Sequence, residues 1–248
     1  MGRWDGSCLA TKNPGVGGTD PAPKGMAIED CAVDDANAVV QLLQAEECIT
    51  FSSGLTAPYA IYLGANLSTD VRSVVLNTPL VPPAFFRSDQ GETIPIMFAL
   101  MRAERFSPRL VRFLLRSAEA HIKRIGIKRF IASQFAKIPS DRDAALRPEN
   151  LRELENSVNA QYILGRQRDE TDMLIVMRDW TPWIQGCDAP ISIVHGPENP
   201  VMSPRVYGRF QEKFPNSVRL APIKGAAAAP GMTHAAEVVQ IMSDAFDA

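Results

Sequence analysis

In the first third of the chain, short apolar runs alternate with longer segments that have the pattern of helices. Runs rich in β-branched or other apolar residues, bounded by Gly, Pro or polar turns, predict strands at 7–13, 48–51 and 71–79. Between them, residues 28–44 have apolar positions at helical spacing, and 57–66 predict a second helix. This alternation predicts a parallel sheet with crossover helices.

The middle of the chain differs, because residues 82–179 show no strand pattern. Helix-like segments at 107–126, 147–165 and 169–180 occupy this region instead. A block of helices between sheet segments predicts a helical cap inserted into an α/β core.

The alternation of strand and helix resumes after the helical block. The predicted elements are, in order, strand, helix, strand and helix at 190–196, 203–214, 217–225 and 234–246. Ser203 and Pro204 favour a helix start, as N-cap and first helical residue. The predicted division is core residues 1–81, a helical cap at 82–185 and core residues 186–248.

Composition indicates a globular protein and makes several partners unexpected. The 248 residues are 46% hydrophobic and 22% charged, with a net charge of −2, so no nucleic-acid or membrane partner is expected. No apolar run reaches the length of a membrane span, no secretory signal is present and the four cysteines are scattered, which predicts a cytoplasmic location. The stretch GVGGTD lacks dinucleotide-binding spacing and no residues have metal-site spacing, so no cofactor or metal is expected.

Five stretches, in order, resemble the α/β-hydrolase fold and its branch with a helical cap, which includes esterases and lactonases. Residues 13–39 are similar to the segment after the fourth core strand, and residues 50–60 to the nucleophile elbow. Residues 71–79 are similar to the sixth strand, 191–204 to the seventh strand with its acid loop, and 221–242 to the eighth strand with its histidine loop. The resemblance implies a mostly parallel α/β core with an inserted helical cap. It also implies that the first core strands are missing, because the likeness begins near residue 8.

The elbow-like stretch reads Thr50-Phe51-Ser52-Ser53-Gly54. By the resemblance, Ser52 falls at the position of the nucleophile, and the backbone N–H of Ser53 falls at that of one oxyanion donor. Thr50 replaces the usual small first residue, which crowds the turn. The same residues also fit an ordinary polar turn.

The positions of the base and the acid carry residues without the required chemistry. The resemblance puts Ala228 at the histidine position and Asn199 at the acid position. Alanine has no proton to exchange, and asparagine cannot stabilise an imidazolium by charge. His234 lies six residues after Ala228 and is an alternative base, with Glu198 or Asn199 to orient it. His195 is expected to pack in the core.

The expected function is therefore that of a non-catalytic α/β-hydrolase-fold protein, a small-molecule-binding or sensory module that could be part of a longer chain. Its ligand is expected to be small and apolar and to bind between core and cap, lined by Phe85, Met97 and Trp180. Two alternatives stay open. One is weak hydrolysis of an ester or lactone by Ser52. The other is an interaction subunit whose open sheet edge is completed by a partner chain or by self-association.

Overall fold

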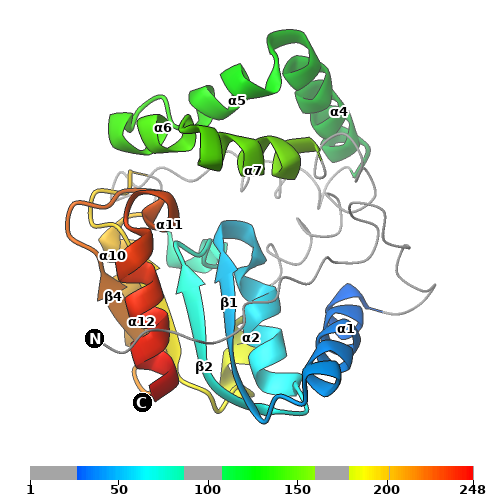
Figure 1. The fold of residues 1–248 in the computed structure, drawn as a ribbon, viewed down its shortest axis with the longest axis vertical. Helices are drawn as coiled ribbons and strands as arrows, with labels where there is room; N and C mark the ends of the chain where they lie inside the picture. Colours follow the sequence, from blue (N-terminus) through cyan, green and yellow to red (C-terminus); the bar gives the residue numbers. More distant parts are fainter. Residues whose placement is uncertain (1–26, 87–107, 160–178, 201, 248) are drawn as a thin grey trace.

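A computed structural model describes residues 27–86, 108–159, 179–200 and 202–247 (Figure 1). Its elements are, in chain order, α1 (Ile28–Leu43), β1 (Glu47–Ser53), η1 (Gly54–Thr56), α2 (Ala57–Asn66), β2 (Asp70–Asn77), η2 (Pro83–Phe85), α4 (Pro108–Ile125), α5 (Ile127–Gln134), α6 (Pro139–Ala145), α7 (Pro148–Val158), α9 (Thr181–Gln185), β3 (Ile191–His195), α10 (Pro204–Lys213), β4 (Val218–Pro222), α11 (Pro230–Thr233) and α12 (Ala235–Asp247). The strands predicted after residue 44 are present. The strand predicted at 7–13 lies outside the described residues.

The four described strands form one parallel sheet in the order β1-β2-β3-β4. The register pairs Thr50 with Val74, Val74 with Ile191, and Ile191 with Val218. Strands of a parallel sheet that are buried on both faces are rich in aliphatic residues rather than alternating. This explains the apolar runs in β2 and β3, and the mostly parallel α/β core with crossover helices is confirmed.

Helices cover both faces of the sheet. α2, α9 and α10 contribute to the larger core cluster, which lies on the face that carries Val74, Leu76 and Ile193. α12 packs on the opposite face against Val75 and Val194. The division follows from strand geometry, in which successive side chains point to opposite faces.

The helices α4–α7 form a separate layer, called here the helical layer. Figure 1 shows them in green, across the end of the sheet toward which the strand arrows point. They pack around their own apolar cluster, which includes Ile122, Ile131, Ala145 and Val158. The helical layer therefore lies over the carboxyl ends of the parallel strands.

The start of α10 departs in one respect from the sequence-based expectation. The helix begins at Pro204, but Ser203 makes no side-chain cap, and its Oγ has no hydrogen-bond partner among the described residues. The helix start is therefore favoured by Pro204, whose fixed φ suits the first helical position and whose missing N–H needs no partner.

Candidate functional site

The turn between β1 and α2 lies at the carboxyl end of the sheet. β1 runs through Ser52 and Ser53, and the short turn η1 leads into α2. Gly54 has φ +62°, a left-handed conformation that favours glycine. A Cβ added to Gly54 would meet nothing within 4 Å in the part of the chain that the structure describes. The sharp bend of this turn is thus at Gly54, two residues after Ser52.

Ser52 points to the face of the sheet that α2 covers. It pairs with Leu76, and Thr50 on the same face donates its Oγ1 to the Ala60 carbonyl of α2 at 3.0 Å. Ser52 is 8% exposed, and its Oγ has no hydrogen-bond partner among the described residues. His195 also faces this side, but it lies on β3, two strands away from β1, which is roughly 10 Å by the spacing of strands.

Ser52→Ala is expected to leave the free energy of unfolding unchanged or to raise it by up to about 1 kcal/mol, because the methyl group replaces a buried hydroxyl without a partner. Thr50→Val is the matched control on the same strand and face. The Thr50 hydroxyl bonds Ala60, so its removal is expected to cost about 1 kcal/mol. Urea denaturation measures both values. A loss of about 2 kcal/mol for Ser52→Ala would show that the hydroxyl is part of a hydrogen-bond network.

Ser53 faces the opposite side of the sheet. Asn77, at the end of β2, donates its Nδ2 to Ser53 Oγ at 3.1 Å. Thr78 follows with φ +49° and donates its N–H to the Val194 carbonyl at 2.7 Å. Gly231 of α11 lies over this group, since a Cβ there would come within 3.1 Å of Asn77 Nδ2. The Ser53 side chain therefore links β1 to β2, and the oxyanion role of its N–H stays a prediction.

Asn199, at the predicted acid position, is buried in the turn after β3. Its N–H donates to the Gly196 carbonyl at 3.1 Å, and its Oδ1 accepts the N–H of Met202 at 3.1 Å. Asparagine commonly stabilises a turn in this way. Glu198 beside it is exposed, and its N–H bonds the Ala226 carbonyl at 3.3 Å. The Asn199 side chain therefore holds its own loop.

Ala228, at the predicted histidine position, is engaged through its backbone. Asp141 of α6 accepts the N–H groups of Ala228 and Ala229 on one carboxylate oxygen, Oδ2, at 2.8 and 3.1 Å. Asp141 is 0% exposed, and its Oδ1 has no hydrogen-bond partner within the described ranges. Burial raises the pKa of the Asp141 carboxyl, against the two N–H groups and the charge of His234, which lower it. Burial thus disfavours the ionised carboxylate here, although two donors point at it.

The two histidines near the site have other neighbours. His234 follows α11, and its Nδ1 lies 2.8 Å from the Thr233 hydroxyl. His195 is buried against Tyr207, with ring centroids 5.0 Å apart, and burial lowers the pKa of its imidazole. Neither ring is hydrogen-bonded to Ser52 in the described structure. The structure therefore does not bring a nucleophile and a base together at these residues.

The side chains predicted to line a ligand cleft are found in the core or lie outside the described residues. Phe85 and Trp180 pack edge-on against Phe210, with ring centroids 4.9 and 5.6 Å away. Trp180 is fully enclosed in the larger core cluster, and Phe85 packs against that cluster. Met97 lies outside the described residues. Phe85, which is partly buried, and Trp180, which is buried, thus pack around α10, and their role in lining a ligand site stays a prediction.

Candidate metal ligands are scattered through the described part of the chain. No three His, Cys, Asp or Glu side chains there are grouped so that they could hold a metal ion. Among the helices of the same residues, none has the length and apolar character needed to cross a membrane.

No protein-family model and no curated protein matches the sequence. Solved structures do match. A bromoperoxidase from Bacillus anthracis matches with a TM-score of 0.67 and 14% identity, over 95% of this chain and 80% of that one. A thermophilic esterase from Thermogutta terrifontis matches with a TM-score of 0.57 and 14% identity, over 94% of this chain and 76% of the esterase. An α/β hydrolase from a deep-sea metagenome library matches with a TM-score of 0.58 and 14% identity, over 94% of this chain and 76% of that hydrolase.

The chain has the α/β-hydrolase fold. In the α/β-hydrolase fold the nucleophilic serine sits on the strained strand-to-helix turn, and the next residue supplies an oxyanion N–H. Here that turn bends at Gly54, while Ser52 lies within β1. The sequence carried a signal of this difference. If the bend is placed at Ser52, Gly54-Leu55-Thr56 leaves more residues before α2 than the turn needs.

Proposed function

We propose that this α/β-hydrolase-fold chain is a non-catalytic protein that binds or senses a small molecule. The observation that carries the proposal is the hydroxyl of Ser52, which is buried and has no hydrogen-bond partner in the described structure. A serine hydroxyl is a weak nucleophile unless a positioned base takes its proton. Gly54, at the bend of the turn, has no side chain that could act as the nucleophile in place of Ser52.

The residues at the base and acid positions support the same conclusion. Ala228 has no side-chain base, and Asp141 holds its N–H. The Asn199 side chain holds the turn after β3. Loss of the base alone lowers the kcat of a serine protease by roughly a million-fold. A site that lacks base and acid is therefore not expected to hydrolyse an ester at a useful rate.

The proposed ligand site is the carboxyl end of the sheet, beneath the helical layer, which acts as the cap. In open α/β sheets, ligands bind outside the carboxyl ends of the strands. Sites between a core and a cap are mostly apolar with a few polar groups that orient the ligand. Ser53, Asn77 and Thr78 supply such polar groups at the ends of β1 and β2. A small apolar ligand fits this proposal best.

Weak hydrolysis of an ester or lactone is the alternative function. The solved neighbours include an esterase and a hydrolase of E-2-(acetamidomethylene)succinate, which favours it. It would require Ser52 to come into hydrogen-bond reach of His234, the alternative base after α11. In the described structure Ser52 Oγ contacts neither His234 nor His195 by a hydrogen bond.

Labelling with a serine-reactive fluorophosphonate separates the two functions. The wild-type chain is expected to show no labelling above that of Ser52→Ala, because no base activates the hydroxyl. Circular-dichroism melts confirm that both proteins are folded. Labelling that disappears in Ser52→Ala would overturn the non-catalytic proposal. Labelling that disappears only in Ser53→Ala would overturn it through the neighbouring serine.

An interaction role remains a third proposal, based on the edge of the sheet. β1 pairs with β2 alone among the described strands, and Phe51 on β1 is 44% exposed. Long unpaired edges favour pairing with another chain. Light scattering of the purified chain tests self-association. A dimer that Phe51→Lys dissociates would support this role, and a monomer at all concentrations would argue against self-association.

A further inference from the structure

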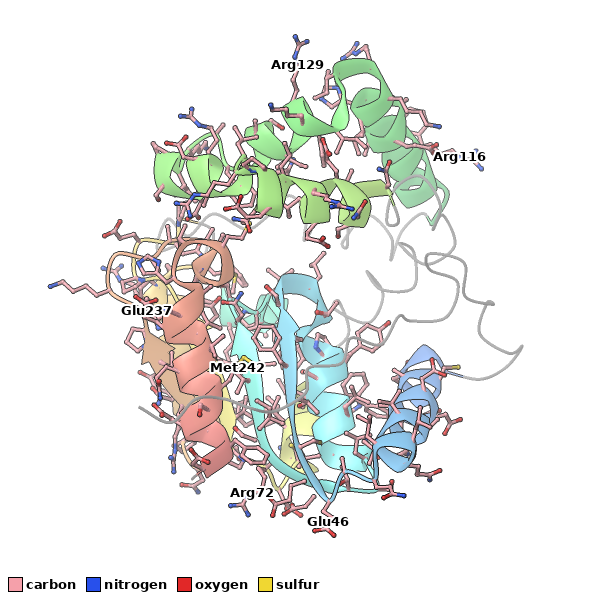
Figure 2. The ribbon with its side chains drawn as sticks, viewed as in Figure 1. Glu46, Arg72, Arg116, Arg129, Glu237 and Met242 are labelled. Atoms are coloured by element: carbon pink, nitrogen blue, oxygen red, sulfur yellow. The ribbon has the colours of Figure 1, made fainter. Side chains whose placement is uncertain are left out.

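The helical layer packs as a unit of its own. Its apolar cluster is distinct from those on the two faces of the sheet, and Met232 of α11 packs against it from the core. Arg116 of α4 and Arg129 of α5 project from its outer side (Figure 2). The contacts of this layer with the rest of the described chain include those of α6 with α11. A unit that has its own core can move as one body.

Asp141 lies at the contact between this unit and the core. It comes from the first turn of α6 and reaches the loop before α11, where its Oδ2 accepts the N–H groups of Ala228 and Ala229 at 2.8 and 3.1 Å. α6 also packs beside α11. One side chain of the helical layer therefore accepts two hydrogen bonds from backbone N–H groups of the core.

The same contact is incomplete. Asp141 is fully buried, and Oδ1 has no partner among the described residues. An ionised oxygen that is buried without a donor loses its hydration and gains nothing in return. Burial accordingly raises the pKa of this carboxyl. Release of the contact would expose the Asp141 carboxyl to water. Hydrogen bonds from water to Asp141 could then replace those that its Oδ2 accepts in the closed arrangement.

We propose that Asp141 is the latch of a movable helical cap. With Oδ2 on the N–H groups of Ala228 and Ala229, the layer α4–α7 is held over the carboxyl ends of the strands. When the latch is released, the layer moves away as a unit and uncovers them. This device does not depend on whether the site beneath it binds a ligand or hydrolyses one.

Hydrogen exchange of the full chain tests the latch, with Asp141→Ala and Asp143→Ala as a matched pair on α6. Asp143 is exposed, and its ion-pair partner among the described residues is the neighbouring Arg142 at 3.2 Å. In Asp141→Ala, the amides of 228–229 and of α5–α7 are expected to exchange at least about tenfold faster, because two backbone donors lose their acceptor. The amides of β2 and β3 are expected to keep their wild-type rates. In Asp143→Ala, every rate is expected to stay within about twofold of wild type.

Two results would overturn the latch. One is unchanged exchange of α5–α7 in Asp141→Ala. The other is faster exchange across β2 and β3 as well, since Asp141 would then support the whole fold. If Asp141→Ala yields no folded protein, Asp141→Asn decides, because it keeps an acceptor oxygen without the charge. Faster exchange confined to 228–229 and α5–α7 in Asp141→Asn supports the latch, and faster exchange across the sheet, or none anywhere, overturns it.

Discussion

Replacing Phe210 with alanine is expected to lower the free energy of unfolding by about 3–5 kcal/mol. Phe210 of α10 is fully buried. Phe85, Trp180 and Phe214 meet its ring edge to face, with centroids at 4.9, 5.6 and 5.3 Å. Truncation leaves a cavity lined by these rings. Tyr207 on the same helix donates a buried hydrogen bond from its hydroxyl to the Pro79 carbonyl, which opposes a shift of α10 into the cavity.

Chemical denaturation measures this loss, and Phe113→Ala is its control. Phe113 is 64% exposed on α4, so its truncation is expected to change stability by no more than about 0.5 kcal/mol. A loss below about 1 kcal/mol for Phe210→Ala would contradict the enclosed packing of its ring. Phe85 and Trp180 would then again be candidates for the lining of a ligand cleft.

Gly196→Ala is expected to cost about 2–4 kcal/mol. A Cβ at Gly196 would lie 2.2 Å from the Ala226 carbonyl oxygen and 2.3 Å from that of Ala227. Both are backbone atoms, so no side chain can rotate away and the loop itself must move. The next two residues of that loop donate the N–H groups that hold Asp141. The substitution is therefore expected to loosen the helical layer as well as the core.

Gly208→Ala is the matched control for Gly196→Ala. Gly208 lies within α10, and a Cβ there would meet nothing within 4 Å among the described residues. The same chemical change is expected to raise stability by about 0.5–1 kcal/mol, because alanine favours the helix and restricts the unfolded chain. Urea denaturation of the two variants gives both values. Equal effects at the two positions would contradict the close approach of Gly196 to the loop.

The core of this fold could be predicted from the sequence because its signals are local. Val74, Val75 and Leu76 form an apolar run bounded by polar residues, and its short length and β-branched residues favour a buried strand over a helix. Pro204 likewise marks the start of α10, and the apolar spacing of α12 identifies its buried face. The order β1-β2-β3-β4 agrees with the tendency of consecutive strands to lie beside one another.

The site could not be predicted in the same way, because its geometry depends on one backbone angle and one distant contact. The residues around Ser52 fit a nucleophile elbow, but the position of the bend is set by the positive φ of Gly54. No pattern in the sequence indicated that Asp141 joins the helical layer to the core. An acidic residue in the first turn of a helix is ordinary, and its partners Ala228 and Ala229 lie 87 and 88 residues away. Backbone partners also leave no trace in the identity of the side chain at 228.

The glycine at the bend of the turn bears on how this chain could evolve. A Cβ at Gly54 would meet nothing within 4 Å in the described part of the chain, although the φ of +62° would strain a serine there. Without a base, such a serine would add almost no hydrolysis, since the members of a triad act as a unit. A histidine introduced at Ala228 alone would have no nucleophile to activate, and an aspartate at Asn199 alone would have no imidazole to orient. No single substitution among these three positions would therefore bring a nucleophile, a base and an acid together.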